Sequence, residues 1–252
     1  MTYCLALCVG EGIAFAADTR SNAGVDYVSS YRKLHRFKTG PNNVVALLAA
    51  GSLATTQEVV STLRRDLLSN GNESFNSHRH LFEMAGYVGR VSRAVQRTHA
   101  ESLNSSGVSG EATFIMGGQI RGEPPGIYMI YPQGNFIEAS DDTPYLQIGE
   151  SKYGKPVLDR FASRDLSLDQ AVRLAVLSLN ATVQSNVTVG TPLDLGIYHA
   201  DSLQPLVTGR LDEADEYYVQ INEAWNRALK NAFLELPSFR WPNVEHEHLE
   251  IP

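Results

Sequence analysis

Thr2 could supply both a nucleophile and a base. Removal of Met1, which is usual when a small residue follows the initiator, would leave a free α-amine on the residue that carries the hydroxyl. Because the ordinary pKa of such an amine is about 8, part of it is neutral at pH 7 and can accept the hydroxyl proton, directly or through one water. Such a residue could attack an amide carbonyl. Since every chain has an N-terminus, this interpretation depends on what surrounds Thr2.

Asp18 is the first charged group that we expect near Thr2. It ends the apolar run 13–17, where a carboxylate is unusual, and a buried carboxylate needs a partner. If the turn at 10–12 joins two paired strands, we expect Asp18 to lie opposite Cys4. Thr2 then lies opposite Arg20, and Asp18 is its diagonal neighbour on the same face of the sheet.

Lys33 is the natural partner of Asp18. It lies within segment 27–37, which has the pattern of a further strand. An ammonium group held by Asp18 and directed at Thr2 would favour the alkoxide and lower the pKa of the amine. The alternatives are an ordinary structural ion pair, or a solvated basic face of the same segment.

Two glycine turns could complete a site. Gly51 follows the apolar run 44–50 and precedes a helix, so a backbone N–H there could stabilise an oxyanion, although the glycine could simply make the turn. Gly149 is followed by Glu150 and Ser151. Ser151 could relay a proton or cap a helix.

The elements that must position these residues come in groups. We expect helices from Ser52 to the Asn-Gly pair at 70–71, over 77–103, and in two segments after residue 148, the second opening with a capping box of Ser167 and Gln170. Pairs of helices between groups of strands do not fit a doubly wound βαβ sheet. They predict an α+β fold of four layers, αββα, in which two antiparallel sheets are flanked by helices. Strands are expected at 2–9, 13–18, 27–37, 44–50, 112–116, 126–131, 135–139, 145–148, 193–198 and 204–208.

We expect residues 1–252 to form one domain that ends in a long helix, about 212–236, and a surface tail, 237–252. The helix begins acidic and carries basic residues later, which suits the helix dipole. Its apolar stripe could pack into the core or contact another subunit, and we favour the core. The stripe consists of Tyr218, Ile221, Trp225, Leu229 and Phe233.

The motifs together resemble proteasome β subunits and their bacterial relatives. Besides Thr2, they are Ala-Ala-Asp-Thr-Arg-Ser at 16–21, Tyr-Arg-Lys-Leu at 31–34 and Ala-Ala-Gly-Ser-Leu-Ala at 49–54. The spacing of Thr, Asp and Lys is nearly that of the family. The runs at 21–26, 51–56 and 149–156 resemble more closely the ancestral-β-subunit family, Anbu, of the N-terminal-nucleophile hydrolase superfamily. The resemblance extends in element order from Thr2 to about Thr208.

This resemblance implies roles for individual residues. Thr2 would be nucleophile and base, Asp18 and Lys33 the activating pair, and the Gly51 N–H a donor in the oxyanion hole. Glu150 or Ser151 would take the place of the serine in the family's Gly-Ser-Gly turn. The family also implies peptide or protein substrates and a homo-oligomer, either a ring or an open helical assembly.

Two positions depart from the family pattern. A later Asp-x-x-Ser-Gly motif reads Asn-Val-Thr-Val-Gly at 186–190, so Asn186 stands for the acid and Val189 for the serine. The change motivates a rival hypothesis, in which the chain is a non-catalytic or weakly active assembly or binding protein on the same fold. A second rival is a narrow amidase rather than a general peptidase.

Composition bounds the remaining function classes. A net charge of −7 argues against a nucleic-acid binder, which needs a basic face. No apolar run reaches the roughly 18 residues of a membrane span, and no signal peptide is visible, so we expect a cytoplasmic protein.

Cys4 and Cys8 are too far apart on one strand for a disulfide and are expected in the core. We expect no cofactor and no metal, and a solvated His246-Glu247-His248 tail.

Overall fold

The computed structural model describes residues 2–22, 28–69 and 73–239. Three sequence predictions fall outside them: the removal of Met1, the helix end at 70–71, and the end of the tail with its two histidines. None of the described helices is both long enough and apolar enough to span a membrane.

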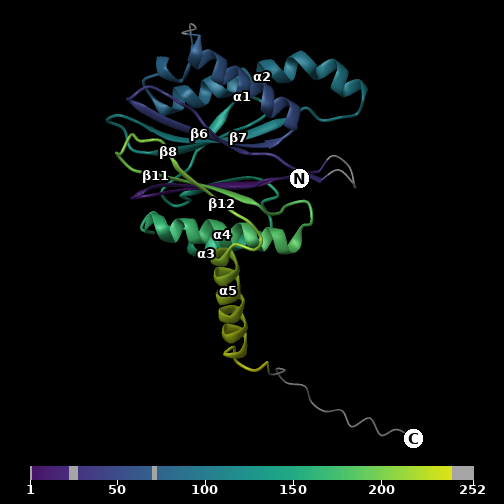
Figure 1. The fold of residues 1–252 in the computed structure, drawn as a ribbon, viewed down its shortest axis with the longest axis vertical. Coiled ribbons are helices and arrows are strands. Elements are labelled where there is room, and N and C mark those ends of the chain that lie inside the picture. The colour runs from purple at the N-terminus through teal and green to yellow at the C-terminus, as the bar shows by residue number, and fades with distance from the viewer. Residues whose placement is uncertain (1, 23–27, 70–72, 240–252) are drawn as a thin grey trace, which may run out of the picture.

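The described chain forms two antiparallel five-stranded sheets stacked face to face (Figure 1). The first sheet has the order β10-β1-β2-β11-β12, with bounds β1 Tyr3–Val9, β2 Gly12–Asp18, β10 Tyr145–Gly149, β11 Leu193–His199 and β12 Val207–Leu211. The second has the order β5-β6-β7-β8-β9, with bounds β5 Leu34–Arg36, β6 Asn43–Gly51, β7 Ala112–Ile120, β8 Gly126–Ile130 and β9 Phe136–Glu138. A short hairpin pairs β3 Arg20–Asn22 with β4 Val28–Ser30.

Helices cover the outer face of each sheet (Figure 1). The pair α1 and α2 packs on the second sheet, and α3 and α4 pack on the first. A third apolar cluster fills the space between the sheets. The predicted αββα sandwich is therefore confirmed. The helices are α1 Leu53–Leu68, α2 Leu81–Ser105, α3 Lys155–Phe161, α4 Leu168–Ser185 and α5 Glu216–Leu234, with a 3-10 turn, η1, at Phe75–Ser77.

The N-terminal strand is apolar throughout because both of its faces are buried. Leu5 and Leu7 pack toward α3 and α4, whereas Cys4 and Cys8 pack between the sheets. Both cysteines are free and buried, as predicted.

The predicted pairing of β1 with β2 is wrong by one residue. Cys4 lies opposite Ala17 rather than Asp18, because the two-residue turn pairs Val9 with Gly12. A glycine is required there: a Cβ at position 12 would lie 1.9 Å from the Tyr198 carbonyl oxygen, at a φ of 148°. The shift places Asp18 beside the backbone of Tyr3.

The single strand predicted over 27–37 is also wrong. The segment is interrupted, with Lys33 between β4 and β5 rather than within a strand. The interruption is fixed from both sides, because the Tyr31 amide donates to the Thr19 carbonyl (2.8 Å) and the Ala49 amide donates to the Lys33 carbonyl (3.0 Å). The segment thus passes from the hairpin to the second sheet.

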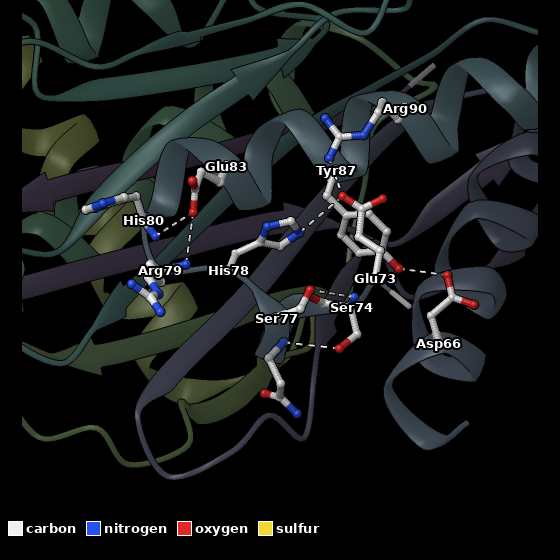
Figure 2. Close-up of polar contacts among 11 residues, drawn as sticks. Asp66, Glu73, Ser74, Ser77, His78, Arg79, His80, Glu83, Tyr87 and Arg90 are labelled. Atoms are coloured by element: carbon white, nitrogen blue, oxygen red, sulfur yellow. Dashed lines mark hydrogen bonds and ion pairs between the residues drawn. The ribbon is translucent and has the colours of Figure 1, made fainter. Parts of the chain in front are cut away.

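The second helix begins later than predicted, at Leu81 rather than near Ser77 (Figure 2). The Glu83 carboxylate reaches back and accepts the amides of Arg79 (2.9 Å) and His80 (3.1 Å), which fixes the first turn. The last strand is likewise shifted, from the predicted 204–208 to Val207–Leu211.

The apolar stripe of α5 lies mostly outside the core. Tyr218 is buried and its hydroxyl contacts Asn180, but Leu229 and Phe233 are 49% and 73% exposed. The helix leaves the layered body after its first turns (Figure 1), so the preference for a core role is wrong for its distal half.

Candidate active site

Thr2, Lys33 and Gly51 line one cavity of about 430 Å³. Its floor is the end of β6, one wall is α1, and the other is the segment around Lys33. The three residues come from distant parts of the chain, so the sandwich brings together three of the five candidates that the sequence suggested. Asp18 lies behind them and is fully buried.

The Asp18 carboxylate holds Lys33 and the N-terminal strand together. Its Oδ1 accepts from the Lys33 ammonium at 2.6 Å and from the Tyr3 amide at 3.0 Å. The Gly190 amide approaches Oδ2 at 3.4 Å, and Lys33 also donates to the Arg20 carbonyl at 2.6 Å. The carboxylate therefore positions both the cation and the residue that follows Thr2.

Burial dominates the electrostatics of this pair. Loss of solvent raises the pKa of the Asp18 carboxyl, while the Lys33 ammonium and the amides of Tyr3 and Gly190 oppose the rise. The two charges are therefore mutually dependent, because removing either one leaves the other without its main compensation.

The Thr2 backbone is fixed by the turn at Gly149. The Glu150 amide donates to the Thr2 carbonyl at 2.7 Å. Gly149 has a φ of 85°, and a Cβ there would lie 1.9 Å from the Thr2 carbonyl oxygen. Only glycine permits this approach.

Replacing Gly149 with alanine is therefore expected to displace Thr2. We expect a loss of at least about 2 kcal/mol in the free energy of unfolding, from left-handed strain plus the clash, and a fall in any Thr2-dependent hydrolysis. Denaturant titration and an amidase assay measure the two effects. Gly209→Ala is the matched control, because nothing lies within 4 Å of a Cβ there. Equal stability of the two variants would contradict this account.

Glu150, rather than Ser151, connects to the remaining family positions. Its buried carboxylate accepts from the Asn186 amide group at 3.0 Å, and the Asn186 oxygen accepts from Thr188. Ser151 is not among the described residues that line the cavity. The described contact of Ser151 is through its carbonyl, which accepts the Lys155 amide.

Gly51 marks the change from β6 to α1. It has a φ of 109°, and a Cβ there would lie 2.3 Å from the Glu111 carbonyl oxygen. Ser52 caps the helix by accepting the Thr55 amide at 3.4 Å. The N-terminus of a 16-residue helix, the positive end of its dipole, therefore lies at the cavity.

His35 and Arg64 also line the cavity wall, and the sequence analysis gave a role to neither of them. Burial, and then the Arg64 guanidinium, lowers the pKa of His35 to about 4, with Asp194 opposing. The imidazole is therefore neutral at pH 7. The helical spacing of polar residues on α1 was the available signal for Arg64.

His35 is expected to make stability depend on pH. Its pKa is 6.5 when unfolded and about 4 when folded, so its contribution is complete above pH 6.5 and falls as the pH drops toward 4. The loss should total about 3 kcal/mol, because only the unfolded state binds the proton in this window. Urea titrations of the wild type and His35→Gln at several pH values isolate the effect. A pH-independent difference between the two proteins would contradict it.

Comparison with known proteins agrees with this geometry. The family model "Proteasome subunit" matches residues 2–198. The chain belongs to the proteasome family, and its fold is that of the N-terminal-nucleophile hydrolases. None of the curated proteins in the comparison matches the chain.

Solved structures place the chain more narrowly within this family. Anbu from Yersinia bercovieri is 41% identical, with a TM-score of 0.89, over 96% of this chain and 100% of that one. The Anbu complex from Pseudomonas aeruginosa, described as a helical assembly, is 40% identical, with a TM-score of 0.89, over 94% and 98%. A Gly-1 mutant of Anbu from Hyphomicrobium sp. strain MC1 is 40% identical, with a TM-score of 0.87, over 96% and 100%. The chain is a member of the ancestral-β-subunit group, Anbu.

Proposed function

We propose that the chain is a threonine-type amide hydrolase that acts through Thr2 after Met1 is removed. The observation that carries the proposal is the buried Lys33–Asp18 pair, which is bonded to the amide next to Thr2 at the cavity that Thr2, Lys33 and Gly51 share.

The residues divide the chemistry between them. The Thr2 amine accepts the hydroxyl proton, and the oxygen attacks the carbonyl carbon of the substrate. The Lys33 charge favours the alkoxide, and the Gly51 N–H at the α1 N-terminus stabilises the oxyanion. The tetrahedral intermediate expels the amine product, which takes the proton, and leaves an ester on Thr2. Water then hydrolyses the ester, releases the acid and restores the hydroxyl.

The same family supports a homo-oligomer. The Pseudomonas aeruginosa relative is described as a helical assembly, and we expect this chain to self-associate, with substrate reaching Thr2 from within the assembly. A cytoplasmic location remains an expectation from the sequence.

Glu150 has a role of its own in the proposal. We expect its carboxylate, which accepts from Asn186, to replace the acid of the family's later motif.

One observation favours a non-catalytic assembly protein instead. Val189, at the position of the family's second serine, is buried among apolar residues and offers no proton relay. A Thr2→Ala protein that performs the cell's task unchanged would support this rival.

A library of short acylated peptides tests the proposed function. The Met-free protein is expected to release amine from several sequences, and the Thr2→Ala protein from none. Cleavage of one sequence only would favour a narrow amidase. No cleavage by the Met-free assembly, with no adduct on Thr2, would overturn the proposal.

A further inference from the structure

The residues of α1 that line the cavity recur at a regular spacing. Its lining residues fall at positions 53, 56, 57, 60, 61 and 64, the spacing of one helix face. The face ends in Arg64, and the opposite wall carries Arg32 and Lys33. Ala49 and Ala50, at the end of β6, also line the cavity, and their small side chains leave space in it.

The charges on these walls are all of one sign. Arg32, Lys33 and Arg64 line the cavity, and none of its described lining residues is an aspartate or glutamate. The chain as a whole is acidic, with 28 acidic and 21 basic residues. The cavity therefore has a local charge opposite to that of the protein.

Two of the three cations are available to a ligand. Lys33 is held by the Asp18 carboxylate, but within the described residues neither Arg32 nor Arg64 has an ion-pair partner. The described contact of Arg64 is with the Phe37 ring, 6.0 Å from its centroid. By contrast, the neighbouring Arg65 is bonded to Asp66 at 2.9 Å. Asp194, which opposes the lowering of the His35 pKa, forms an ion pair with Arg210 at 2.7 Å.

The Arg64 charge acts on another residue of the cavity, His35. It is one of the groups that lower the pKa of His35, which lines the same space. A carboxylate entering there would meet a neutral imidazole and two guanidinium groups, which form strong, charge-assisted hydrogen bonds with carboxylates.

We propose that the cavity selects substrates in which the residue that donates the scissile carbonyl carries a carboxylate side chain, bound by Arg64 with Arg32 on the facing wall. The inference rests on the proposed function, because it assigns a substrate class to the same site. It gives Arg64 a role in specificity and none in the chemical step.

Matched peptides test the proposal. Four acetylated tetrapeptide aminocoumarin amides, identical except for a last residue of Glu, Gln, Leu or Lys, are compared by kcat/KM. We expect Glu to exceed Gln by at least about tenfold, the factor that one hydrogen bond to a charged group supplies. Added salt should raise KM for the Glu peptide and leave that for Gln nearly unchanged. Arg64→Gln should remove the preference, and Arg64→Lys should keep part of it.

Arg65→Gln is the control, because Arg65 is adjacent in sequence but absent from the cavity wall. It should retain the preference for Glu. A wild-type protein that cleaves Gln or Leu peptides as well as Glu, or an Arg64→Gln protein that keeps the full preference, would overturn the proposal.

A binding measurement separates this inference from the proposed function. Fluorescent peptides ending in Glu or Gln are titrated into the Thr2→Ala protein, which cannot hydrolyse them. Tenfold tighter binding of Glu that depends on Arg64 would support the inference even if hydrolysis failed. Equal binding of the two peptides would overturn it even if hydrolysis were observed.

Discussion

Replacing Thr2 with valine in the Met-free protein is expected to reduce amide hydrolysis on the order of 10⁴-fold or more. Valine keeps the branched shape of the side chain but removes the attacking oxygen. Because Thr2 is only partly buried and its described contact is through its carbonyl, the fold should be unaffected. Release of a fluorescent amine measures activity, and thermal unfolding measures the fold.

Thr2→Ser is the matched control, because it keeps both the hydroxyl and the amine. It should retain measurable activity on the same peptide. A Thr2→Val protein with a tenth or more of the wild-type rate would show that another group performs the attack.

Replacing Lys33 with methionine is expected to abolish hydrolysis and to destabilise the fold by about 3–5 kcal/mol. The reason is that Asp18, which is fully buried, loses the ammonium that compensates its charge. Denaturant titration measures the loss of stability. The surface variant Lys155→Gln, which breaks a half-exposed pair with Asp159, should cost at most about 1 kcal/mol.

A double variant separates stability from catalysis. Lys33→Met with Asp18→Asn removes both charges and leaves an oxygen that can accept the Tyr3 amide. We expect it to recover much of the lost stability and none of the activity. Recovery of activity together with stability would mean that the pair serves the fold alone.

The layer architecture could be predicted from the sequence because it follows from the grouping of elements. Strands such as β6 are apolar on both faces, which requires layers covering both faces of the sheet, and helices occur in pairs between strand groups. The capping box at Ser167 fixed the start of α4 for a local reason, so it too could be predicted.

The details that failed depend on contacts distant in sequence. The register of β1 and β2 follows from a two-residue turn in which Gly12 approaches Tyr198 of β11 closely, and no local pattern reveals that approach. The break at Lys33 depends on backbone hydrogen bonds with Thr19, between β2 and β3, and with Ala49 in β6. The exposure of Phe233 depends on where α5 leaves the body, since its stripe has the same spacing as a core helix.

The residue types of the candidate site could be predicted from the sequence, but the hydrogen bonds between its residues could not. Thr2, Lys33 and Gly51 were expected together and share a cavity. The link from Asp18 to the Tyr3 amide follows from the register that the sequence did not reveal. The same holds for Glu150, whose link to Asn186 joins residues 36 positions apart.

The role of Thr2 is tested by the mass of the intact Met-free protein after incubation with an electrophile that reacts with N-terminal threonines. We expect one adduct per chain, located on Thr2 by peptide mapping, absent in Thr2→Val and much slower to form in Lys33→Met. An adduct on another residue, or none on Met-free protein, would contradict the claim that Thr2 is the nucleophile activated by the buried pair.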